Sequence, residues 1–117
     1  MIPPYSIVFV TAPDRKAADT IADGLINAHL AACVNIVPGL SSVYWWEKKV
    51  QRSEEILLII KTRTALLAEL GDFVKKNHPS SVPEVISVHI QDGFKGYLDF
   101  IGANTLFTKR SREGPRA

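Results

Sequence analysis

The sequence predicts one α+β domain built from two successive β-α-β halves, and three observations predict this class. The chain has 117 residues, close to the usual length of a single domain. Hydrophobic residues make up 46% of it, which suits a packed core and is too high a share for a disordered chain. Apolar runs of strand length alternate with apolar stripes at helical spacing, in the order strand, helix, strand, strand, helix, strand.

The first half begins with a strand that leads directly into a helix. Residues 6–11 are apolar at both alternating positions, which is typical of a central strand covered on two sides. Asp14 follows, where the positive end of a helix favours a carboxylate. Ala17, Ile21 and Leu25 then recur at helical spacing, so we predict a helix of about four turns.

Two strands joined by a turn come next. Residues 32–46 indicate one long bent strand, because Pro38-Gly39 interrupts the strand pattern without ending it. Residues 47–51 form a polar turn. Residues 54–62 then return as an antiparallel strand.

The second half repeats the pattern of the first. Thr64 is predicted to cap a helix that ends with Asn77 in the left-handed conformation, since Pro79 bars its continuation. A strand over residues 82–90 and a short helix after Gly93 complete the order. Two right-handed split units of this kind give a four-stranded antiparallel sheet with both helices on one face, the ferredoxin-like arrangement.

The other face of this sheet is predicted to be apolar as well. The run over residues 56–60 supplies side chains to both faces, and Tyr44-Trp45-Trp46 adds large aromatic rings near a turn. Uncovered apolar patches of this size usually mark interfaces. We therefore expect a homo-oligomer in which sheets pack against each other.

The net charge of +2 is concentrated at the C-terminal end of the chain. The last nine residues contain one acidic residue, Glu113, and four basic ones: Lys109, Arg110, Arg112 and Arg116. Without them the body holds 10 basic and 11 acidic residues. We predict a folded domain over residues 1–108 and a basic, disordered tail over residues 109–117. Four charges give weak, salt-sensitive affinity, so nucleic-acid binding is not expected.

Sequence features also bear on the cellular compartment. No apolar run reaches the roughly 18 residues of a membrane-spanning helix, so no membrane span is expected. The first five residues show no basic start followed by an apolar stretch, so no secretory signal is predicted. Cys33 is the single cysteine and fits a reducing compartment. We expect a cytoplasmic protein.

The three histidines and the cysteine are first candidates for chemistry. His78 follows the second helix, where the helix dipole favours it, and a ligand or metal role would need partners from elsewhere in the fold or from another subunit. His29 lies near the end of the first helix, where the helix dipole likewise favours a histidine. His89 alternates with apolar strand residues and is expected to be structural. Cys33 is typical of a small buried hydrophobe. The sequence contains no zinc-site spacing, phosphate loop or nucleophile-elbow serine.

Charged residues within or beside the apolar strands allow two interpretations. Lys61 and Glu84 border strands where a charge must be solvated, paired or bound, so they form either an ion pair or part of a pocket. Glu47 is either a solvated turn residue or, with Trp46, the rim of a cleft between subunits.

Several short fragments, in this order, resemble the CutA family, which is named for divalent-cation tolerance. They span nearly the whole chain except the tail and are Phe9-Val10-Thr11-Ala12-Pro13, Ala31-Ala32-Cys33-Val34-Asn35, Pro38-Gly39, Tyr44-Trp45-Trp46-Glu47, Ile60-Lys61-Thr62, His78-Pro79 and Val82-Pro83-Glu84-Val85-Ile86.

The resemblance implies a non-catalytic, ferredoxin-like subunit in a tight homotrimer similar to the PII signalling proteins. It implies clefts between subunits lined by Trp46, Glu47, Lys61, His78 and Glu84. Bacterial members of the family are tied to copper tolerance and can bind divalent copper, and animal members are linked to anchoring acetylcholinesterase at membranes. We therefore expect a role in divalent metal tolerance or binding, or in scaffolding of partner proteins.

This chain departs from the family pattern beside the implied cleft. Ser80 and Ser81 stand where the family has Tyr-Glu, and Lys48 stands where its turn has Gly, which predicts a different turn geometry. Of the copper ligands in some bacterial members, a cysteine and two histidines, the matching positions here are Val10, Asn77 and His78. His78 is thus the one remaining metal-ligand candidate, and we expect no obligatory cofactor and at most weak copper binding.

Two other functions are compatible with this fold class. A small-molecule or nucleotide sensor of the PII kind would use a long basic loop, which is missing from the sequence. An acylphosphatase-like enzyme would need a glycine-rich phosphate loop around an arginine. Arg15 follows the first strand, but Pro13-Asp14 precede it instead of such a loop.

Overall fold

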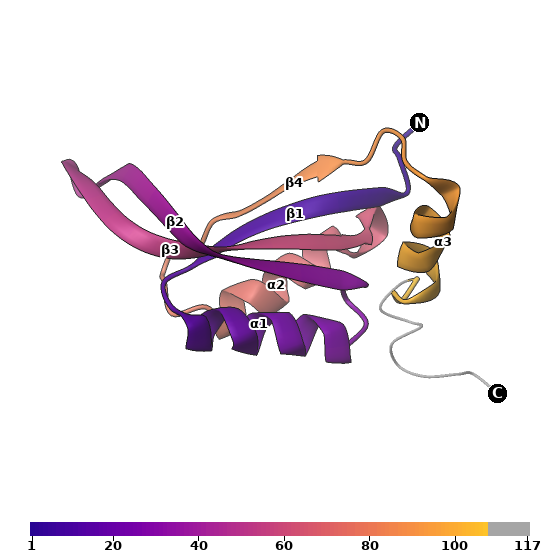
Figure 1. Cartoon of the computed structure of the whole chain (residues 1–117), viewed down its shortest axis with the longest axis horizontal. Coiled ribbons are helices and arrows are strands. Elements are labelled where there is room, and N and C mark those ends of the chain that lie inside the picture. The colour runs from indigo at the N-terminus through magenta and orange to yellow at the C-terminus, as the bar shows by residue number, and fades with distance from the viewer. Residues whose placement is uncertain (108–117) are drawn as a thin grey trace.

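The strands and helices of the protein follow the predicted order, with one short helix at the C-terminal end (Figure 1). The computed structural model describes residues 1–107, so the predicted tail over residues 109–117 lies outside the described residues. The elements are β1 (Tyr5–Ala12), α1 (Arg15–Asn27), β2 (Cys33–Trp46), β3 (Lys49–Arg63), a 3₁₀ turn (Thr64–Leu66), α2 (Leu67–Asn77), β4 (Val85–His89) and α3 (Lys95–Ala103).

The strands form one antiparallel sheet in the order β2-β3-β1-β4. Helices α1 and α2 lie side by side on one face of this sheet, and α3 lies beside the strand ends far from the β2–β3 turn (Figure 1). This confirms the ferredoxin-like α+β fold. Among the described residues, no helix has the length and apolar character needed to cross a membrane.

The core lies between the sheet and the two helices. Alternate residues of β1 and β3 point toward the helices, because successive side chains of a strand face opposite sides. The apolar stripe predicted for α1 packs against these strand side chains. The largest fully buried side chains of this layer include Val8, Val10, Ile21, Leu25, Leu58, Ile60, Leu70 and Val74.

The ends of the two helices differ from the sequence prediction. The Asp14 side chain accepts a hydrogen bond from the Ala17 backbone N–H at 2.8 Å, which confirms the predicted start of α1. The left-handed residue, however, is His29 after α1, with φ of 56°, and not Asn77. Asn77 stays helical, and α2 ends because His78 is extended. Proline disfavours the helical conformation of the residue before it, so Pro79 ends the helix through the extended backbone of His78 and not through a left-handed Asn77.

Three other expectations about local structure also need correction. Thr64 does not cap α2, because its hydroxyl donates to the Pro3 carbonyl at 2.7 Å and the chain enters α2 through the 3₁₀ turn. The turn between β2 and β3 consists of Glu47 and Lys48 alone, with φ of 50° and 66°, as a two-residue type I′ turn requires. β4 starts only at Val85, since Pro83 offers no N–H to a sheet ladder.

The long bent strand is confirmed. β2 runs without a break through Pro38-Gly39, and its register to β3 shifts between Val37 and Leu40. Such an irregularity bends a strand and increases its twist. The β2–β3 hairpin therefore curves and projects beyond the rest of the sheet (Figure 1).

Candidate functional site

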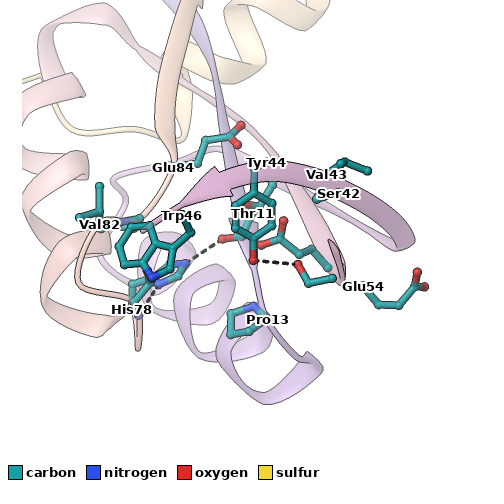
Figure 2. Close-up of a pocket in the computed structure, with 14 residues that line it drawn as sticks. Thr11, Pro13, Ser42, Val43, Tyr44, Trp46, Glu54, His78, Val82 and Glu84 are labelled. Atoms are coloured by element: carbon teal, nitrogen blue, oxygen red, sulfur yellow. Dashed lines mark hydrogen bonds between the residues drawn. The ribbon is translucent and has the colours of Figure 1, made fainter. Parts of the chain in front are cut away.

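A cleft of about 730 Å³ lies where the curved hairpin approaches the end of β1 (Figure 2). Thr11 and Pro13 from the end of β1 line it. The hairpin supplies Tyr44, Trp46, Ser53, Glu54 and Glu55, among others. The third wall is the segment between α2 and β4, with His78, Ser80, Val82, Pro83 and Glu84.

Three of the five predicted cleft residues come together here, namely Trp46, His78 and Glu84. Figure 2 shows the Trp46 ring beside the His78 imidazole and near Val82. The other two predicted residues lie elsewhere in the single chain. Glu47 is exposed in the hairpin turn, and Lys61 is near the other end of β3.

The His78 ring is held by two backbone groups. Its Nε2 lies 2.7 Å from the Thr11 carbonyl oxygen, and the Ser80 backbone N–H donates to its Nδ1 at 3.0 Å. A carbonyl can only accept and an amide N–H can only donate, so these partners assign the neutral tautomer with its proton on Nε2. Both ring nitrogens are therefore engaged within the chain.

The remainder of the cleft is apolar and acidic. Tyr44 and Trp46 give it an aromatic wall, and the Tyr44 hydroxyl accepts a hydrogen bond from Ser53 at 3.3 Å. Glu54, Glu55 and Glu84 contribute carboxylates, and no lysine or arginine is among the lining residues of the described chain. Sequence reasoning missed Glu54 and Glu55, because their position follows from the curvature of the hairpin and not from any local pattern.

The described residues of one subunit bring no set of metal ligands together. Within residues 1–107, no three His, Cys, Asp or Glu residues form a group that could hold a metal. Val10 is fully buried in the core, and the Asn77 side-chain amide donates to the Phe73 carbonyl at 2.9 Å. His78 as a metal ligand stays a prediction, and its two hydrogen bonds oppose that role.

Lys61 belongs to a second polar cluster, on the sheet face opposite α1 and α2. Its ammonium group donates to the Asn35 side-chain oxygen, so it does not form the ion pair with Glu84 that was one of two alternatives. Cys33 is aligned with Lys61 in the sheet and is half-buried, in contrast to the predicted buried position. Burial, followed by the hydrogen bond and charge of Cys33, raises the pKa of Tyr97 on α3.

Neither alternative function gains support from this geometry. Arg15 is exposed and paired with Asp19 at 2.9 Å, and the Asp14 carboxylate occupies the start of α1, where a phosphate would otherwise bind. The carboxylates that line the cleft would also repel the phosphates of a nucleotide.

Known proteins resemble this chain in sequence. The rice protein "Protein CutA 1, chloroplastic" is 51% identical over 102 residues, which cover 87% of this chain. The chain spans 58% of the length of that rice relative and 56% of the length of the matching Arabidopsis thaliana protein. A "Divalent-cation tolerance protein CutA" of Thermus thermophilus is 44% identical over 99 residues, or 85% of this chain and 96% of that relative.

A solved structure and a family model agree with these sequence matches. The crystal structure of CutA1 from Oryza sativa superposes with a TM-score of 0.88 at 48% identity, covering 92% of this chain and 98% of that chain. The family model "CutA1 divalent ion tolerance protein" matches residues 6–104, which include all the elements from β1 to α3 apart from Tyr5. The chain therefore belongs to the CutA1 family of divalent-ion tolerance proteins.

Proposed function

We propose that this chain is a non-catalytic subunit of a homotrimer that serves divalent-cation tolerance, either by binding metal weakly or by scaffolding partner proteins. Tolerance is the role for which the family is named. The proposal of an assembly is supported by one observation: the face of the sheet opposite α1 and α2, here called the outer face, is left largely uncovered by the described residues of the subunit. Three copies are the number that the CutA resemblance implies.

The outer face is apolar across three strands. Ile59, Phe9 and Ile86 stand opposite one another in the register of β3, β1 and β4. Ile86 and Val88 of β4 are 58% and 50% exposed in the single chain. Burial of apolar surface contributes roughly 25 cal/mol per Å², so covering this face with other copies favours association.

The mass in solution tests the assembly. The subunit has a mass of 12.9 kDa, so size-exclusion chromatography with light scattering should report about 39 kDa. A mass near that of one subunit in dilute neutral buffer would contradict the proposed homotrimer.

Copper titration tests the metal alternative within this proposal. Isothermal calorimetry with Cu²⁺ should show a dissociation constant no tighter than about micromolar, because a single imidazole makes a poor site even for copper. Zn²⁺ is the matched control and should bind no more tightly. Nanomolar, stoichiometric Cu²⁺ binding would show that the chain carries a site that we have not placed, and would favour metal binding over scaffolding.

A cytoplasmic location and the absence of catalysis complete the proposal. The single Cys33 supports a reducing compartment, although the name of the rice relative places that protein in the chloroplast. If the chain acts as a scaffold, it would bind a partner protein, as the animal members of the family are linked to anchoring acetylcholinesterase. Hydrolysis of acetyl phosphate at enzymatic rates would contradict the non-catalytic role.

A further inference from the structure

We propose that His78 is a positioning residue that fixes one wall of the cleft and does not bind metal. The proposal deepens the proposed function by excluding its one predicted ligand. It depends on that function only for the choice of metal probes, since the positioning itself is testable in the metal-free protein.

The His78 imidazole has no free lone pair for a metal ion. Nε2 carries the proton that it donates to the Thr11 carbonyl, and the lone pair of Nδ1 accepts the Ser80 N–H. A metal binds histidine through an unprotonated nitrogen. Coordination at Nδ1 would break the Ser80 bond, and coordination at Nε2 would remove the proton and the bond to Thr11.

Breaking the hydrogen bond between His78 and Thr11 is costly. Thr11 is 9% exposed, and its carbonyl oxygen receives the His78 proton in a partly buried contact. A buried polar group that loses its partner is destabilised by about 1–3 kcal/mol. Within the described residues no group of candidate ligands gathers to offset that loss with a multidentate metal site.

The His78 ring holds one wall of the cleft against β1. Residues 78–84 connect α2 to β4, and this connection carries Val82 and Glu84 into the cleft. The His78 ring joins the start of the connection to the end of β1, 67 residues away in sequence. Lys75 of α2 adds a further bond to the Ser81 carbonyl. The imidazole thus stands between β1 and the connection, beside Trp46 (Figure 2).

Nitrogen NMR of the imidazole tests the assignment directly. In protein labelled with ¹⁵N-histidine, the His78 ring should show a protonated Nε2 and an unprotonated Nδ1 at neutral pH. Adding Zn²⁺, a diamagnetic probe, should leave both ring signals unchanged up to several equivalents. A saturable shift of either His78 nitrogen with Zn²⁺, or the opposite tautomer, would overturn the proposal.

Amide hydrogen exchange at Ser80 tests the positioning. In His78→Ala, the Ser80 N–H loses its acceptor and should exchange about tenfold faster than in the wild type. His78→Asn keeps an acceptor near the Nδ1 position and should exchange more slowly than His78→Ala. Equal Ser80 exchange in the wild type and His78→Ala, or in the two variants, would contradict the assigned bond.

The control is His89→Ala, which removes an exposed histidine of β4 whose aligned partner in β1 is Ser6. This variant should leave Ser80 exchange at the wild-type rate. Calorimetry should also give the Cu²⁺ affinity of His78→Asn within about threefold of the wild type. A tenfold or greater loss of that affinity would support His78 as a ligand and refute the proposal.

Discussion

The substitution Ile86→Asp is expected to convert the assembly into single subunits while leaving each subunit folded. Ile86 is 58% exposed in the isolated chain, so the subunit loses little buried apolar area when this side chain changes. In an assembly that covers the outer face, the carboxylate would be removed from water without a partner. Burying an unpaired carboxylate weakens association by several kcal/mol, and this loss occurs at every interface of the assembly.

Light scattering measures this effect, and Ile26→Asp is the matched control. Ile26 is 38% exposed on α1, in the helical layer on the other side of the sheet. Ile86→Asp should report a mass near 12.9 kDa with an unchanged circular dichroism spectrum, and Ile26→Asp should keep the mass of the wild type. A wild-type mass for Ile86→Asp would mean that subunits do not associate through the outer face.

The substitution Gly24→Val should lower the free energy of unfolding by about 2 kcal/mol, the usual cost of overpacking a contact between elements. Gly24 lies on α1 where α2 packs against it. A Cβ atom at this position would lie 2.3 Å from Cζ of Phe73 and 2.8 Å from its Cε1. The aromatic ring would have to leave its half-buried site at the edge of the core.

Gly71→Val is the matched control, because a Cβ at Gly71 of α2 meets nothing within 4 Å. Valine has a slightly higher helix propensity than glycine, so this variant should be more stable by a few tenths of a kcal/mol. Urea denaturation at equal subunit concentration measures both, since association makes stability depend on concentration. The double variant Gly24→Val/Phe73→Leu should recover part of the free energy of unfolding that Gly24→Val loses. A Gly24→Val protein as stable as the wild type would contradict the predicted clash.

Local patterns in the sequence were sufficient to predict most of the fold. The apolar stripe of α1, its start beside Asp14 and the bent strand at Pro38-Gly39 each depend on neighbouring residues, and the structure has all three. Helix ends were harder to predict. Asn77 is a common left-handed residue, but its backbone stays helical and its side-chain amide donates to the Phe73 carbonyl. The residue that takes the left-handed conformation is His29, after the other helix.

The candidate site could be predicted only in part. The resemblance pointed to Trp46, His78 and Glu84, which do meet in one cleft. It could not show that the Thr11 backbone occupies one nitrogen of His78, because that contact joins residues 67 positions apart and involves no side chain of Thr11. Lys61 and Glu47 lie outside this cleft in a single chain, and the sequence carries no information on how far the hairpin curves.

The place of β1 inside the sheet has a consequence for how the chain acquires its structure. β2 and β3 are neighbours in sequence and can pair as soon as both are synthesised, whereas β1 pairs with β4, whose residues come about 80 positions later. Closing so long a loop is slow, because the chain loses conformational entropy before the strand contacts that offset this loss have formed. We therefore expect the β2–β3 hairpin to pair first and the contacts between β1 and β4, which join the most distant strands of the sheet, to form among the last.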